Sequence, residues 1–124
     1  MPDYHFLEIS RRDEVIVVRF KDSKLIDDLA IVKVGKELFA LAAEPGGRHL
    51  LLDFAGVDYL SSMFLSKLLG LKKRLEKKQG KLKLCAICPD VREVFAITKI
   101  DTILDIVETE DKALAAFAEN PPEG

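Results

Sequence analysis

The sequence predicts one α/β domain with a mixed, mostly parallel sheet of four to five strands and about four helices. Short apolar runs alternate with longer segments whose apolar residues recur every three to four positions, a pattern typical of parallel strands joined by crossover helices. Two β-rich runs separated only by the polar residues Arg11–Glu14 predict a hairpin, which adds an antiparallel strand. A chain of 124 residues fits a single domain of this kind.

The expected elements follow in the order β-β-α-β-α-β-α-β-α. Apolar periodicity and chain breakers place strands at 4–9, 15–20, 49–54, 82–87 and 102–107, and helices at about 27–43, about 61–79, from 89 and from 109. Helix-start signals are Asp27 or Asp28, Ser61 or Ser62, Pro89, and Thr109. The first helix has two apolar rows: Leu25, Leu29, Val32 and Phe39, and beside it Ile31, Val34, Leu38 and Leu41. We expect a core over residues 4–118 and a flexible tail at 119–124.

Charge and composition restrict the partners of the protein. The formal net charge of −2 lacks the basic excess of nucleic-acid-binding proteins, so we expect no nucleic acid partner. No run approaches the ~18 apolar residues of a membrane helix, and the first ten residues do not resemble a signal peptide. We therefore expect a cytoplasmic protein that does not bind membranes.

The residue types that are common in active sites do not form a known catalytic motif in this sequence. The sequence contains no glycine-rich phosphate loop and no nucleophile elbow. Neither His5 nor His49 has a serine or carboxylate at a catalytic spacing. The carboxylates are scattered over predicted helix surfaces, where they act as solvated groups and caps. We expect no enzyme, no cofactor and no metal.

Cys85 and Cys88 have the C-x-x-C spacing of redox proteins. Cys85 falls inside an apolar strand, where a thiol behaves as a small hydrophobic group. Cys88 precedes Pro89 at a predicted helix start, whereas a thioredoxin-like site places both cysteines at a helix N-terminus. We interpret the pair as structural, and keep thiol redox activity as an alternative.

A basic run occupies the C-terminal half of the second predicted helix: Lys72, Lys73, Arg74, Lys77, Lys78 and Lys81. This run suits either a docking patch for an acidic partner or a solvated face whose charges complement a helix C-terminus. We favour the solvated face, because no aromatic residue is interleaved for stacking on nucleic-acid bases.

Ser61 and Ser62 stand where a loop becomes the second helix. One serine suits an N-cap, which contributes ~1 kcal/mol. The other needs no capping role and suits phosphorylation, because a helix N-terminus favours negative charge. A phosphate of ~1.5 to 2 negative charges at this position would repel an acidic partner surface.

The central segment Leu51–Phe54 followed by Val57–Ser62 resembles the core of STAS domains, in which a strand ending in an acidic residue leads to a hydroxyl pair at a helix start. The C-terminal half is also similar to this family, in Leu82–Cys85, Pro89–Phe95, Asp105–Val107 and Ala113–Phe117. The resemblance covers residues 4–118 and implies the same order of elements.

The regulatory members of this family have the pattern Asp-Ser-Ser/Thr-Gly-Leu, in which one serine is phosphorylated by a kinase that is also the anti-sigma factor. Their unphosphorylated form binds that kinase and so releases the sigma factor. In this sequence Ser61 stands at the aspartate, Ser62 at the phosphoacceptor, Met63 at the second hydroxyl, Phe64 at the glycine and Leu65 at the leucine. The Phe64 ring would either crowd an approaching kinase or anchor the second helix in the core.

The resemblance thus implies an anti-sigma factor antagonist whose partner is an anti-sigma factor and serine kinase of the histidine-kinase-like ATPase type. It implies Ser62 as phosphoacceptor, with Ser61 as second choice. The partner-binding residues it implies are Asp27, Asp58, Tyr59, Ser61, Ser62, Met63 and Phe64. A STAS interaction scaffold that does not switch is the alternative, and the resemblance leaves a homodimer open.

Overall fold

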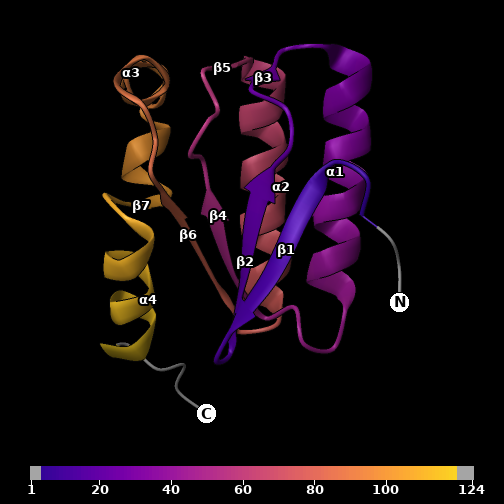
Figure 1. The fold of residues 1–124 in the computed structure, drawn as a ribbon, viewed down its shortest axis with the longest axis vertical. Coiled ribbons are helices and arrows are strands. Elements are labelled where there is room, and N and C mark those ends of the chain that lie inside the picture. Colours follow the sequence, from indigo (N-terminus) through magenta and orange to yellow (C-terminus); the bar gives the residue numbers. More distant parts are fainter. Residues whose placement is uncertain (1–3, 120–124) are drawn as a thin grey trace.

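The computed structural model describes residues 4–119, which form a five-stranded sheet with helices on both faces (Figure 1). The strands are β1 (Leu7–Arg12), β2 (Val15–Phe20), β4 (His49–Asp53), β6 (Lys81–Cys85) and β7 (Asp105–Val107). Their spatial order is β1-β2-β4-β6-β7, and β1 alone pairs antiparallel within this sheet. The predicted mixed, mostly parallel α/β fold is therefore confirmed.

The helices of the described residues divide between the two faces of the sheet. They are α1 (Asp28–Ala43), α2 (Ser62–Lys77), α3 (Pro89–Ile97), α4 (Glu110–Glu119) and the short 3₁₀ helix η1 (Ile100–Thr102). The larger core lies between α1, α2, α3 and one face of the sheet. On the other face, Ala113 and Phe117 of α4 cover Val17 and Leu51. Both faces of β4 are buried, which is why its sequence is a continuous apolar run.

A second, two-stranded sheet was not expected from the sequence. β3 (Lys24–Leu25) pairs parallel with β5 (Tyr59–Leu60), where the sequence predicts a polar break and a loop. Leu25 and Leu60 are buried, whereas Lys24 and Tyr59 are exposed. A pairing of two residues per strand is too short to produce a periodic signal, so sequence patterns do not find it.

The last predicted strand is wrong at its start. Residues 100–102 form η1, and β7 occupies only Asp105–Val107. Ile100 and Leu104 are buried in the larger core, and this tertiary packing overrides the β-branched composition of the segment. The predicted strand at 82–87 ends at Cys85, because Ala86 adopts a positive φ of 58°. Residues 120–124 of the predicted tail lie outside the described residues.

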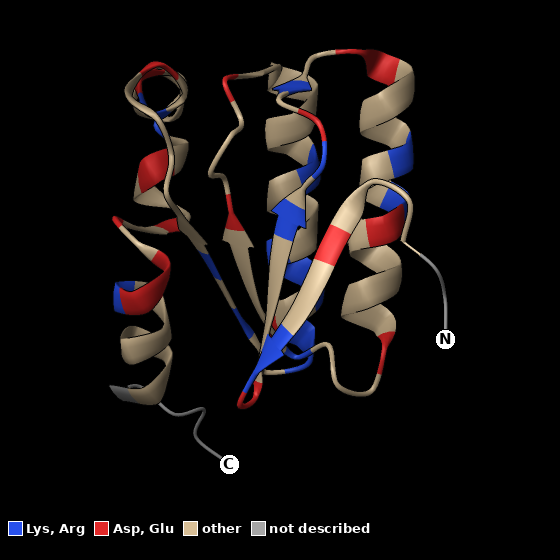
Figure 2. Cartoon of the chain, in the orientation of Figure 1, with Lys and Arg blue, Asp and Glu red and all other residues tan. Residues whose placement is uncertain are grey.

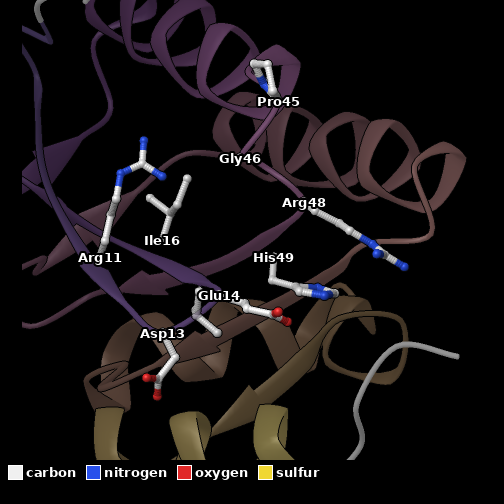
Figure 3. Close-up of a pocket in the computed structure, with 9 residues that line it drawn as sticks. Arg11, Asp13, Glu14, Ile16, Pro45, Gly46, Arg48 and His49 are labelled. Carbon is white, nitrogen blue, oxygen red and sulfur yellow. The ribbon is translucent and has the colours of Figure 1, made fainter. Parts of the chain in front are cut away.

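His49 opens β4 at the sheet edge where the parallel strands begin, beside a cleft of about 300 Å³ (Figure 3). Its Nδ1 accepts a hydrogen bond of 3.1 Å from the Lys81 amide, and its Nε2 is buried with no partner among the described residues. Burial, and then the positive charge of Arg48, lower the pKa of His49 below its ordinary 6.5. The folded protein therefore favours the neutral imidazole more strongly than the unfolded chain does.

We predict that His49 makes the protein less stable in mild acid. Below pH 6.5 the unfolded chain binds a proton at His49 that the folded chain does not bind, so stability is present above that pH and is lost as the pH falls. Urea unfolding at pH values of about 7.5 and 5.5 should show a loss of up to about 1.4 kcal/mol per pH unit below the unfolded pKa. The loss should shrink in His49→Gln; an unchanged loss in that variant would assign it to other groups.

Candidate functional site

The helices α1, α2 and α3 begin beyond the edge of the sheet where the parallel strands end (Figure 1). The pairing of β3 with β5 brings two of these starts together, because Leu25 stands opposite Leu60 and each strand runs directly into a helix. Two residues beyond this pair lie Asp27 on the α1 side and Ser62 on the α2 side. We call this region, which comprises Ile26, Asp27, Leu29, Asp58, Tyr59, Ser62 and Met63, the carboxyl-edge surface.

The start of α1 is capped by a side chain. Asp27 has an extended backbone, and its carboxylate accepts a 3.3 Å hydrogen bond from the Ala30 amide. Asp27 is therefore the N-cap, and Asp28 lies in the first turn of α1. Both residues are exposed, so they place negative charge on the carboxyl-edge surface.

The start of α2 lacks such a cap. Ser61 occupies the N-cap position and its amide donates to the Leu25 carbonyl at 2.9 Å, but its hydroxyl makes no capping bond. The Ser61 Oγ is buried with no hydrogen-bond partner among the described residues. The expectation that a serine hydroxyl caps this helix is therefore wrong. Since its hydroxyl is covered, Ser61 is also a poor position for a phosphate.

Ser62 is the first residue of α2 and is exposed to solvent. Its carbonyl accepts a 3.5 Å hydrogen bond from the Ser66 hydroxyl. The first turn of α2 contains no acidic residue to compensate the positive end of the helix dipole. An exposed hydroxyl therefore stands at an uncompensated helix N-terminus, where the fold can hold added negative charge.

Phe64 belongs to the core and not to the partner-binding surface that the resemblance implies. Its side chain is fully buried, with its ring edge-on to Phe20 at 5.6 Å and to Phe54 at 6.3 Å. Two positions along an α-helix lie about 200° apart around its axis, so Phe64 points inward while Ser62 is exposed. The bulky ring at the position of the family's glycine therefore leaves the approach to Ser62 open. Met63 is half-buried and packs against the same core.

Tyr59 begins β5, the strand that leads to Ser62, and Asp58 directly precedes this strand. The Asp58 amide donates to the Ser23 carbonyl at 2.7 Å, which holds the loop against β3. The Tyr59 ring is 54% exposed and lies 5.7 Å from the Lys24 ammonium. A shallow cleft runs from this pair to Pro89 at the start of α3.

Sequence reasoning missed two residues of this surface. Ile26 is 52% exposed, and Leu29, which the sequence places in an inward apolar row, is 66% exposed. The buried row of α1 is the other one: Ile31, Val34, Leu38 and Leu41. Among the described residues, three of the five large apolar side chains that are more than half exposed lie here: Ile26, Leu29 and Tyr59. Such a cluster is typical of a protein-binding surface.

Comparison with known proteins identifies the family. The family model described as "STAS domain" matches residues 7–113. The chain belongs to the STAS domain family. A Bordetella bronchiseptica protein named "Putative anti-sigma factor antagonist BtrV" is 38% identical over 78 residues, which are 63% of this chain and 67% of that protein.

Solved STAS structures have the same fold. The anti-sigma-factor antagonist (STAS) domain protein of Planctomyces limnophilus superposes with a TM-score of 0.80 at 25% identity, over 90% of this chain and 97% of the other. The Bacillus cell fate determinant SpoIIAA in its phosphorylated form gives 0.66 at 19% identity, over 89% and 97%, and that likeness concerns the fold alone. This STAS domain thus has anti-sigma factor antagonists among its homologues.

The two cysteines of this STAS domain lie in different environments. Cys85 is buried in β6, and burial, followed by the nearby Asp53 carboxylate, raises the pKa of its thiol to about 12. Cys88 is half-buried, its thiol 3.5 Å from the Val57 carbonyl. Both are free thiols. Because the thiolate is the reactive form, the structure does not support the redox alternative.

Asp53, the acidic residue that ends β4, is a structural group. Its carboxylate is buried and accepts from the Arg19 Nε at 3.0 Å and from the Ala55 amide at 2.9 Å. Arg19 also contacts Glu110 of α4 at 3.1 Å. These bonds fix the chain as it leaves the sheet toward β5. Within residues 4–119, no three potential ligands gather as a metal site, and no helix is suited to crossing a bilayer.

We predict opposite responses to alanine at the two N-cap positions of this STAS domain. Asp27→Ala removes a capping bond and should lower the free energy of unfolding by about 0.5–2 kcal/mol. Ser61→Ala removes a buried hydroxyl without a partner, so stability should stay within about 0.5 kcal/mol or rise. Urea unfolding of both variants measures the difference. A loss in Ser61→Ala as large as that in Asp27→Ala would contradict the geometry at α2.

Proposed function

We propose that the protein is a cytoplasmic anti-sigma factor antagonist that binds an anti-sigma factor through the carboxyl-edge surface. Its partner would be a serine kinase of the histidine-kinase-like ATPase type, which phosphorylates Ser62 and thereby ends the complex. The observation that carries this proposal is the exposed Ser62 hydroxyl at the uncompensated start of α2, beside three exposed apolar side chains. The antagonist names of the homologous proteins support it.

The chemistry of the surface accounts for a switch. In the unphosphorylated protein, Ile26, Leu29 and Tyr59 offer apolar area whose burial on a partner is favourable. A phosphate on Ser62 adds ~1.5 to 2 negative charges at the margin of that area. Those charges would have to lose their hydration in the complex, and they add to the exposed carboxylates of Asp27 and Asp58. The complex weakens, while the α2 N-terminus stabilises the phosphate in the free protein.

The second candidate function is a STAS scaffold that binds without switching. It is favoured by Ser61, which stands where regulatory members have an acidic residue and whose hydroxyl is buried without a partner. A kinase that reads an acidic residue next to its target would find none at position 61. The two functions share the carboxyl-edge surface and differ in their response to charge at Ser62.

We predict that Ser62 is the phosphoacceptor. Incubation with an anti-sigma factor kinase from the same organism and Mg-ATP should add one phosphate, which tandem mass spectrometry should locate on Ser62. Ser62→Ala should abolish the added mass. Ser61→Ala should retain it, because the covered Ser61 hydroxyl is not the target. Phosphate located on Ser61, or none on either serine, would remove the switch and leave the scaffold.

We also predict that Leu29 is a binding residue. Leu29→Ser should weaken the complex with that kinase at least about tenfold, since it removes apolar area that the partner would bury and leaves a hydroxyl to be desolvated there. Ile97→Ser is the matched control, because Ile97 is equally exposed but lies at the far end of α3. Calorimetric titration should show that Ser62→Asp also binds the kinase more weakly. The control should bind it with an affinity within about twofold of that of the parent protein. Weakening by Leu29→Ser without weakening by Ser62→Asp would favour the scaffold.

A further inference from the structure

The outer surface of α1 and α2 contains a cleft of about 530 Å³ near the C-terminal ends of both helices. From α1 it is lined by Phe39, Ala42 and Ala43, and from α2 and its C-cap by Gly70, Lys73, Arg74, Lys77 and Lys78. We call it the α1–α2 groove. Figure 2 shows basic residues gathered toward the lower end of α2. Four residues of the basic run, Lys73, Arg74, Lys77 and Lys78, thus form one wall of a groove with an apolar floor.

The positive charges of this groove are not neutralised within the protein. Lys73, Arg74 and Lys77 form no ion pair within residues 4–119. The neighbouring carboxylates are engaged elsewhere: Glu76 pairs with Lys72 and Glu44 with Arg11. If these charges served only to stabilise the helix on a solvated face, ion pairs with neighbouring carboxylates would be compatible with that role. This wall instead presents uncompensated cations toward the groove.

The floor of the groove is held open by a small residue. A Cβ added to Gly70 would lie 3.5 Å from the Phe39 Cζ, so a longer side chain at position 70 would cover the ring. The Arg74 guanidinium stacks on that ring, 4.4 Å from its centroid. Lys78 donates to the carbonyls of Ala42 and Glu44 at 2.5 and 2.9 Å, which fixes the lower end of the groove.

We propose that the α1–α2 groove binds an acidic amphipathic helix of a second protein. Its apolar side chains would cover Phe39 and Gly70, and its carboxylates would pair with Lys73, Arg74 and Lys77. Both helices start at the same edge of the sheet and run alongside each other, so the groove between them suits a third helix. Charge complementarity selects an acidic helix, because the wall is basic while the whole chain carries −2.

Other anionic partners fit this groove less well. Base stacking needs the face of an aromatic ring, and Arg74 already stacks on the face of Phe39, whereas the ring edge at Cζ adjoins Gly70, where apolar side chains of a helix would pack. An anionic membrane favours protruding apolar side chains, whereas here the apolar atoms form the floor and exposed lysines the wall. Both are outcomes that the experiment below distinguishes.

The groove is separate from the carboxyl-edge surface. Gly70 to Lys77 lie 8 to 15 residues beyond Ser62 on the same helix, about 12 to 22 Å along its axis. Ser62 does not line the groove, so the proposal does not rest on phosphorylation. It would make the domain an adaptor that binds one partner at the carboxyl edge and another along α1 and α2.

The test uses the whole chain, labelled with ¹⁵N, and a synthetic helical peptide of about 16 residues with leucines on one face and glutamates on the others. Its control has lysine in place of every glutamate. The glutamate peptide should shift the amide signals of residues lining the groove and leave those around Ser62 unchanged. No shift at millimolar peptide, equal shifts with the lysine control, or shifts confined to the carboxyl edge would overturn the proposal.

The affinity of variants for the glutamate peptide tests whether the peptide binds in the α1–α2 groove. The double variant Lys73→Glu with Lys77→Glu should lower the affinity for the glutamate peptide at least about tenfold, because it reverses the charge of the wall. Gly70→Leu should lower it as much, because the leucine side chain fills the floor. Gly70→Ala, whose Cβ makes only an ordinary contact, and Lys112→Glu on α4 should stay within about twofold. Amide spectra check that each variant is folded. Tighter binding of phosphatidylserine vesicles or duplex DNA, lost in the same variants, would assign the groove to that partner and overturn the helix proposal.

Discussion

The pairing of β3 with β5 is the constraint on which the site depends. Each strand contributes only two residues, but Leu25 and Leu60 are buried and the Ser61 amide donates to the Leu25 carbonyl. Because each strand runs directly into a helix, this pair fixes the start of α1 relative to the start of α2. An exposed Ser62 and an exposed Leu29 can form one surface only while that relationship holds. The small sheet therefore positions the residues of the carboxyl-edge surface, although it contributes few of them itself.

A cluster of phenylalanines holds this arrangement against the main sheet. Phe54 lies at the centre, 5.1 Å from Phe20 and 6.3 Å from both Phe64 and Phe95. Phe20 belongs to β2, Phe54 directly follows β4, Phe64 belongs to α2 and Phe95 to α3, so the cluster joins two helices to the carboxyl ends of two strands. Phe64, which stands where the family pattern has glycine, packs within this core. The replacement concerns stability and leaves the outer surface at Ser62 accessible.

The sequence suffices for the order of the main-sheet strands and α-helices and for a helix start at Ser61 or Ser62. Continuous apolar runs at β4 and β6 predict strands buried on both faces, and a hydroxyl pair before an amphipathic run predicts a helix start. It does not suffice for the β3–β5 pair, since two residues carry no period. It also misplaces Leu29, because two apolar rows of α1 are equally good in sequence and only tertiary packing decides which is buried. The absence of a capping bond from the Ser61 hydroxyl is also not predictable from sequence. A serine at this position predicts such a bond, but the local geometry buries the hydroxyl without a partner among the described residues.

The α1–α2 pair carries negative charge where α1 begins and positive charge where α2 ends. Asp27 and Asp28 lie at the start of α1, whereas Lys73, Arg74 and Lys77 lie near the end of α2. Each charge is favourable for the helix dipole at its own end, so helix stability alone accounts for part of this pattern. Helix stability does not require the cations to line a groove with Phe39 and Gly70 at its floor. Local electrostatics thus explains the sign of the charges, and recognition of an acidic helix explains where they converge.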